Sequence, residues 1–136
     1  MTADSQWEMQ KAVVTALEAA SALTSIIGAD KVCDRIPSGT AYPYVVVGDT
    51  TAIPFDTKDT DGMEQTLTLH TWSQSGDYME TKQIMEAIVD ALDDVSLSLT
   101  GHTLILILFE FSNVFRDPDS KTRHGVQRFR ALTQKP

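Results

Sequence analysis

The chain has 136 residues, 42% of them hydrophobic and 22% charged, which is the balance of an ordinary globular protein. The single cysteine, Cys33, excludes an intramolecular disulfide framework and suits a reducing compartment. Residues 1–6 do not have the pattern of a signal peptide, and the longest apolar run, residues 104–109, is far shorter than the roughly 20 residues that span a bilayer. We therefore expect one soluble domain over residues 1–136, made in a cytoplasm and without a membrane partner.

Charge is distributed unevenly along the chain, whose formal net charge is −8. Residues 1–115 hold seventeen acidic and five basic side chains, whereas residues 116–136 hold two acidic and six basic ones. An acidic body with a basic C-terminal segment can dock head to tail or bind an acidic partner. The alternative is that the arginines pair with carboxylates across the sheet.

Helical spacing marks the first element. Ser5 and Glu8 have the S-x-x-E spacing of a capping box. The apolar residues that follow recur at helical spacing and end at Gly28, a plausible helix C-cap. They are Trp7, Val13, Val14, Leu17, Ala20, Leu23, Ile26 and Ile27.

A strand and a long loop come next. Residues 43–47 are rich in β-branched and aromatic side chains, which predicts a strand that Pro43 opens. Residues 48–62 are polar, contain Pro54, and are expected to form a functional or disordered loop. Residues 63–72 alternate between apolar and polar side chains and predict a half-buried strand.

The second helix is predicted from residue 77 onward. Asp77 and Glu80 have capping-box spacing. The apolar stripe that follows steps by three and four residues, as on one face of an amphipathic helix. Its members are Tyr78, Thr81, Met85, Ile88 and Leu92, widened by Ile84 and Val89.

The strongest feature is the apolar strand predicted at residues 103–115. One face, running from Ile105 to Phe115, is apolar almost throughout and is expected to form the core. The other face carries Leu104, Leu106 and Leu108, a surplus apolar surface that we interpret as a candidate subunit interface. Turn residues at 117–120 and a strand at 126–133 complete a long C-terminal hairpin.

The element order is therefore α-β-β-α-β-β. The predicted fold class is α+β, with a mostly antiparallel four-stranded sheet and two helices packed on one face.

No catalytic, cofactor or metal site is predicted. Phosphate-binding loops are missing, and the loop at 57–68 has the wrong residues at both ends for calcium. His70, His102 and His124 are expected to stand far apart on different elements, and Cys33 has no neighbouring Cys or His, so the short ligand pairs of a zinc site are missing. Cys33 is read as a small apolar residue in preference to a nucleophile.

Two charged segments are candidate partner-contacting surfaces. The acidic loop carries Asp56, Asp59 and Asp61, and the C-terminal hairpin carries Arg116, Lys121, Arg123, Arg128 and Arg130. They allow an alternative function, a small monomeric binding module that grips a charged protein partner through both segments. The net acidity opposes tight DNA binding and leaves at most a transient contact with DNA.

Several phrases, in this order, resemble the tail-completion, or tail terminator, family of long-tailed phages and gene transfer agents. They are residues 35–48 (RIPSGTAYPYVVVG), 67–73 (LTLHTWS), 87–92 (AIVDAL), 115–119 (FRDPD) and 122–131 (TRHGVQRFRA). The resemblance runs from Trp7 to Thr133.

This resemblance implies a structural virion protein without catalytic residues. It would form a hexameric ring that caps the tail tube and joins it to the head connector, or stopper, protein. The expected partners are other copies of the chain, the tail tube protein and the connector, and the expected location is the head-proximal end of the virion tail after synthesis in a bacterial cytoplasm.

Overall fold

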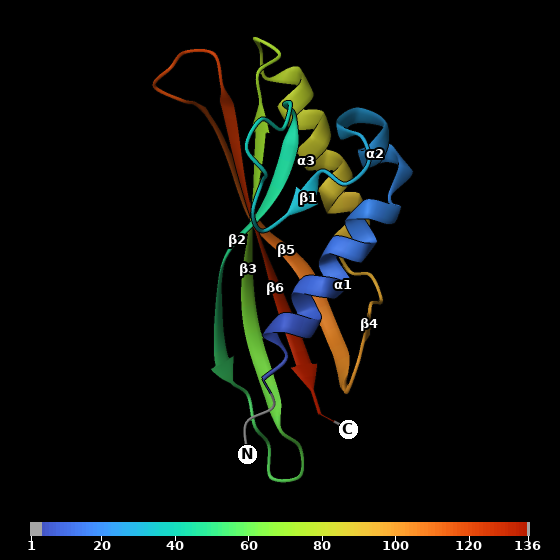
Figure 1. Cartoon of the computed structure of the whole chain (residues 1–136). Helices are drawn as coiled ribbons and strands as arrows, with labels where there is room; N and C mark the ends of the chain where they lie inside the picture. Colours follow the sequence, from blue (N-terminus) through green and yellow to red (C-terminus); the bar gives the residue numbers. More distant parts are fainter. Residues whose placement is uncertain (1–3, 136) are drawn as a thin grey trace.

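The computed structural model describes residues 4–135. Three helices and six strands follow one another along the chain (Figure 1). The helices are α1 (Gln6–Ala19), α2 (Ser21–Ile27) and α3 (Met79–Leu92). The strands are β1 (Val32–Cys33), β2 (Tyr44–Pro54), β3 (Gly62–Ser73), β4 (Ser98–Leu99), β5 (His102–Arg116) and β6 (Arg123–Gln134).

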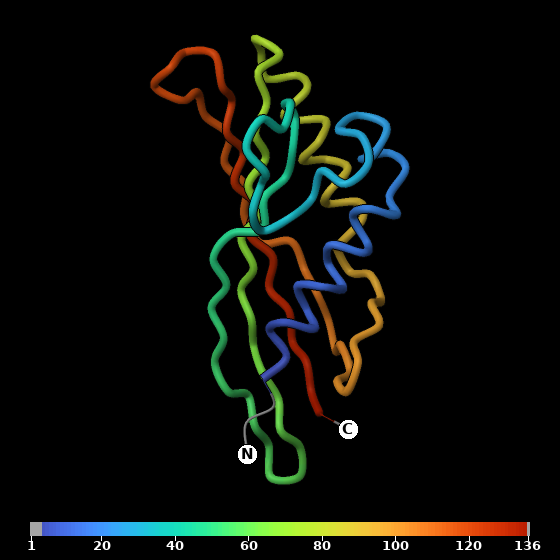
Figure 2. Tube along the Cα trace, viewed as in Figure 1, coloured from blue at the N-terminus to red at the C-terminus, as the bar shows by residue number. Residues whose placement is uncertain are grey.

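All six strands form one mixed sheet in the order β1-β2-β3-β6-β5-β4. The four long strands pair antiparallel, while β1 pairs parallel to β2 through two residues only. The sheet twists strongly, so that its upper and lower halves cross in projection (Figures 1 and 2). Register shifts in β2, between Val47 and Thr50, and in β5 add to this curvature because a bulge increases local twist.

The predicted fold class is wrong in its element count. The sheet is six-stranded and mixed, where a four-stranded antiparallel sheet was expected, and three helices cover it where two were expected. The two missed strands, β1 and β4, are only two residues long, too short for a periodic signal. The third helix arises because Ala20 has an extended backbone (ψ 102°), which ends α1 at Ala19 and lets α2 begin at Ser21.

The boundary of the long loop was also misplaced. Residues 48–54 continue β2, so the turn between β2 and β3 spans only residues 55–61. Polar Thr50 and Thr51 read as loop in the sequence, but both pair with β3. The alternation predicted for residues 63–72 is confirmed in β3, where every second side chain is buried.

The helices pack on one face of the sheet and enclose the core with it. Helix α1 buries Met9, Val13 and Leu17, and α3 buries Ile84, Ile88 and Leu92, as its stripe predicted. Trp7, expected in the α1 stripe, is 61% exposed. The sheet contributes alternate residues of its central strands, among them Leu67, Leu69, Ile107, Phe129 and Ala131.

Neither predicted capping box forms in full, although the Asp77 carboxylate accepts a 3.0 Å hydrogen bond from the Met79 N–H at the start of α3. Ser5 is fully buried, and its hydroxyl lies 2.6 Å from the Thr133 hydroxyl and accepts a hydrogen bond from Gln65 Nε2 at 2.7 Å. The side chain that should cap α1 therefore ties the helix start to β3 and β6 instead. Glu80 accepts a 2.6 Å hydrogen bond from the Ser73 hydroxyl, which anchors the start of α3 to the end of β3.

A pair of phenylalanines tests this division between core and surface. Phe129→Ala empties a fully buried site and should lower the free energy of unfolding by about 3–5 kcal/mol. Phe111→Ala, at a site 43% exposed on the opposite face, should cost about 1 kcal/mol or less. Urea denaturation of both variants measures the difference, and equal losses would contradict the assignment of the two faces.

Candidate functional site

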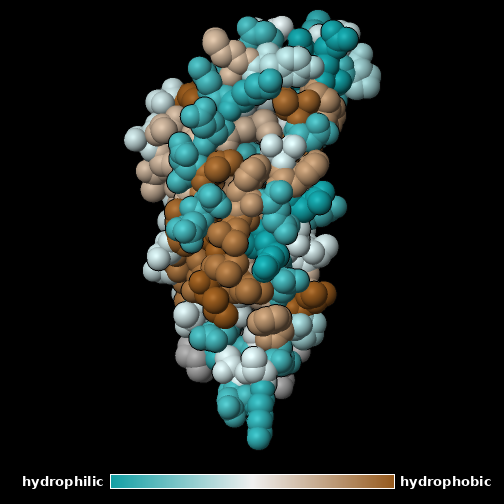
Figure 3. All heavy atoms as spheres, turned by 180° about the vertical axis from the view of Figure 1, so that it is seen from behind, coloured by the Kyte–Doolittle hydropathy of each residue, from teal (hydrophilic) through white to brown (hydrophobic). Residues whose placement is uncertain are grey.

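The face of the sheet turned away from the helices carries an exposed apolar patch. Cross-strand register places Leu106 opposite Leu132, and Leu108 opposite Arg130, on this uncovered face. Viewed from behind, a broad hydrophobic area covers this part of the sheet (Figure 3). Leu108 is 37% exposed, and the bulged residue Ile105 beside it is 48% exposed. An apolar surface of this kind is typical of an interaction site.

The predicted interface residues Leu104, Leu106 and Leu108 therefore do not share one face. A bulge between Leu104 and Leu106 reverses the alternation, so Leu104 pairs with buried Thr133 and packs against the core. The expectation that the face from Ile105 to Phe115 forms the core fails for the same reason. Only Ile107 of β5 is fully buried, and a second bulge at Glu110 sends Phe111 and Phe115 to the uncovered face.

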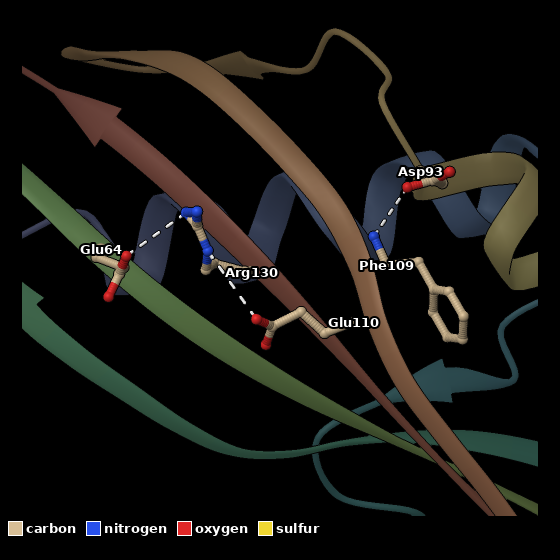
Figure 4. A network of polar contacts seen from close by, with 5 residues as sticks. All are labelled: Glu64, Asp93, Phe109, Glu110 and Arg130. Carbon is tan, nitrogen blue, oxygen red and sulfur yellow. Dashed lines mark hydrogen bonds and ion pairs between the residues drawn. The ribbon is translucent and has the colours of Figure 1, made fainter.

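A chain of charges crosses the uncovered face beside this patch (Figure 4). The Arg130 guanidinium lies 3.5 Å from a Glu64 oxygen and 4.0 Å from a Glu110 oxygen, so one arginine bridges β3, β6 and β5. Arg128 lies over the Phe111 ring, 4.9 Å from its centroid. The pairing of arginines with carboxylates across the sheet, the alternative weighed above, thus occurs at Arg130, whereas Arg128 contacts an aromatic ring.

Another contact in Figure 4 fixes the outer edge of β5. The Asp93 carboxylate accepts a 2.8 Å hydrogen bond from the Phe109 backbone N–H, and the Asp94 N–H donates to the Ile107 carbonyl at 2.8 Å. These contacts occupy polar groups on the side of β5 that faces away from β6. The segment after α3 therefore covers the first half of this edge, together with β4.

The turns of the two charged segments lie at opposite ends of the long axis of the molecule, whereas Arg128 and Arg130 lie along β6 between them. The turn with Asp56, Asp59 and Asp61 forms one tip, and the turn between β5 and β6, with Lys121, forms the other (Figures 1 and 2). Arg123 is buried against α3, donates to the Gly76 carbonyl at 3.2 Å and lies over the Tyr78 ring. Because of this separation, the two turns cannot hold one small partner together.

A histidine pair on the uncovered face went unnoticed in the sequence. His70 Nδ1 and His124 Nε2 lie 2.8 Å apart, although 54 residues separate them in the chain. Trp72 stacks on the His124 ring with centroids 3.8 Å apart, and Phe115 contacts its other side at 4.8 Å. The prediction that the histidines stand apart is therefore wrong for this pair.

The pair belongs to a row of rings across four strands. Tyr44, Trp72, His124 and Phe115 are direct register partners on β2, β3, β6 and β5. Gly48 sits against the pair, since a Cβ there would meet His70 Nε2 at 2.5 Å. The row closes the end of the uncovered face nearest the β5–β6 turn.

Burial lowers the pKa of both histidines below its ordinary value. For His70 desolvation is the main cause, opposed by Asp49. For His124 desolvation comes first and the neighbouring His70 adds to it, while Asp117 opposes them. Since one imidazole must accept the hydrogen bond from the other, the contact requires at least one unprotonated nitrogen.

Cys33 lies on β1 and is partly exposed. Desolvation and the nearby Asp34 charge raise the pKa of its thiol, which keeps it protonated near neutral pH. Within residues 4–135, three or more His, Cys, Asp or Glu side chains nowhere gather in a metal-binding group. The described helices include none long and apolar enough to cross a membrane.

Known proteins share both this sequence and this architecture. The family described as "Tail completion protein gp17" matches residues 11–134. The chain belongs to this tail completion family. One member, tail completion protein gp17 of Bacillus phage SPP1, is 30% identical over 122 residues, which cover 90% of this chain and 89% of the relative.

A solved structure has the same fold. One chain of a native gene transfer agent virion superposes with a TM-score of 0.87 at 24% identity and covers 93% of this chain and 94% of that chain. Membership of the family makes the protein a structural component of the virion tail, in a family of structural proteins and not of enzymes. The resemblance stated from the sequence is thereby confirmed.

The histidine pair predicts that acid destabilises the fold. Both pKa values are depressed in the folded state, so the unfolded chain binds more protons once the pH falls below about 6.5, and stability present above that pH is lost. His124→Phe removes one titrating group and should reduce the difference in unfolding free energy between pH 7.5 and 5. Phe115→Leu, which keeps both imidazoles, should leave that difference in place. Equal pH dependence in wild type and His124→Phe, measured by urea denaturation, would contradict the role of the pair.

Proposed function

We propose that the protein is a ring-forming tail terminator that caps the tail tube and joins it to the head connector. Family membership supports the tail assignment, and the apolar patch of exposed Leu108 with half-buried Leu106 and Leu132 supports the ring. The helices already cover the opposite face, so burying these side chains requires another polypeptide. Other copies of the same chain are the partner that a closed ring supplies.

The elongated shape suits a part that joins two others. Its acidic turn at residues 55–61 and its turn at residues 117–122 lie at opposite tips. Rotation about an axis along the strands would gather six copies of each tip on opposite faces of a hexameric ring. One face would contact the tube protein at the head-proximal end of the tail and the other the connector, with DNA touching the ring only in transit.

The monomeric binding module is disfavoured by the same geometry. That interpretation needs the acidic turn and the basic hairpin to hold one partner, but the turn of the hairpin, with Lys121, lies at the opposite tip of the molecule from the acidic turn. Arg128 and Arg130 also have partners on the sheet itself.

Mass in solution tests the ring. Purified protein should form a ring of about six copies, alone or on addition of tail tube protein, when followed by light scattering and electron microscopy. Leu108→Asp should abolish the ring while the monomer stays folded, because the charge enters an exposed site. Met79→Asp, at a 64% exposed position at the start of α3, is the matched control and should form rings. A strict monomer under both conditions would overturn the proposal.

A further inference from the structure

Both outer edges of the sheet are open over half their length. On β2, strand β1 pairs with Val45 and Val46 only, which leaves residues 48–54 without an outer partner among the described strands. On β5, strand β4 and the Asp93–Asp94 contacts cover residues 102–109, which leaves residues 110–116 open. Each open stretch is seven residues long, and such edges are templates for a further strand.

We propose that neighbouring copies join through these edges, with residues 48–54 of one copy pairing antiparallel with residues 110–116 of the next. This inference rests on the proposed ring and names its interface. One register must satisfy four conditions. The strands must run antiparallel, their side chains must continue the same faces of the sheet, and their free backbone groups must face each other. The covered halves of the two edges must also not collide.

Direction follows from the sheet order. Strands β2, β3, β6 and β5 alternate in direction, so the two edge strands run opposite to each other. Rotation about an axis along the strands preserves direction, and β5 of one copy then meets β2 of the next antiparallel. The contact is heterologous, the type that closes into a ring.

The side chains of the two paired strands must lie on the same face of the sheet, and this condition excludes every second register. Thr51 lies on the uncovered face opposite Thr66, and Asn113 lies on the same face opposite Val126. Full overlap of the two stretches places Gly48 opposite Arg116 and therefore Thr51 opposite Asn113. In this register the faces match, and Ile53 lies beside Phe111 as an apolar cross-strand pair.

Hydrogen-bonding phase selects the same register. The Asp117 N–H donates to the Thr122 carbonyl, so alternation turns the backbone groups of Val114 and Ser112 away from β6. The Phe55 N–H donates to the Gly62 carbonyl, so Ala52 and Thr50 point away from β3. Full overlap sets Thr50 opposite Val114 and Ala52 opposite Ser112. The backbone N–H and C=O groups that point out of the two subunits then face each other and can form hydrogen bonds.

In this register the segments that cover parts of the two edges do not collide. Within one subunit the register runs straight across the sheet from Thr51 through Thr66 and Arg130 to Leu108 on β5. In the proposed contact Thr51 of the next copy lies opposite Asn113, which is five residues further along β5 than Leu108. That offset, about 17 Å at 3.3 Å per residue, over four strands spaced about 4.8 Å apart, is a tilt of roughly 40°, as in closed sheets. Strand β1 then lies beyond the end of the neighbour's β5.

The same arrangement covers apolar side chains at the two open edges. Ile53 and Phe111, which it places opposite each other, are 56% and 43% exposed in the single chain, and their contact shields part of both.

Cysteine cross-linking tests the register. In a Cys33→Ser background, Thr51→Cys with Asn113→Cys should give a reducible ladder of multimers on mild oxidation, since both positions are exposed and directly opposed. Neither single variant should form a disulfide dimer, because a heterologous contact never places a residue against its own copy. Thr51→Cys with Leu108→Cys is the offset control and should stay uncross-linked.

Proline variants test the backbone contact independently. Ala52→Pro removes an N–H that points outward, so it should prevent the ring and leave the melting temperature of the monomer nearly unchanged. Thr51→Pro removes an N–H directed at β3 and should destabilise the monomer itself.

The outcomes distinguish a failure of the proposed interface from a failure of the proposed ring. Rings that form without the ladder, or a dimer from either single cysteine variant, would overturn the interface and leave the ring standing. Protein that remains monomeric with tube protein present would overturn both.

Discussion

The structure depends on a sheet that is larger than the helix layer able to cover it. Four long strands present two faces, and α1, α2 and α3 bury only one of them, around Phe129, Leu67 and Leu69. The opposite face must then be made stable in water. Arg130 between Glu64 and Glu110 and the ring row from Tyr44 to Phe115 meet that need over part of it, and Leu106, Leu108 and Leu132 are what remains apolar.

Bulges decide which side chains fall on which face. The bulge at Glu110 breaks the alternation of β5, so that Ile107 and Phe109 before it lie on the face under the helices. Phe111 and Phe115 after it lie on the uncovered face, where Arg128 lies over one ring and His124 against the other. The same bulges add the twist that curls the sheet. Curvature and surface chemistry therefore have one cause.

A feature could be predicted from the sequence where it depends on residues close together in the chain. The stripe of α3, the alternation of β3 and the C-terminal hairpin depend on neighbours within a few residues, and their periodicity is visible in the chain. The family resemblance was visible too, because it rests on the order of phrases. The bulges, the pairing of His70 with His124 and the diversion of Ser5 to Thr133 are set by cross-strand register. One residue of slip in that register exchanges the faces, which is why Leu104 was assigned to the wrong one.

An open edge is a liability for a protein that works alone, and chains of that kind protect it with charge, proline or a covering segment. Here the protection is present but incomplete. Asp93, Asp94 and β4 cover the first half of the β5 edge and β1 covers the start of the β2 edge, while Pro54 stands at the end of the open part of β2. The open stretches left on the two edges are equal in length, and an edge closed throughout would forbid pairing. In the proposed ring the covers therefore select the register, because the open part of β2 can pair with the open part of β5 of the next copy at one offset.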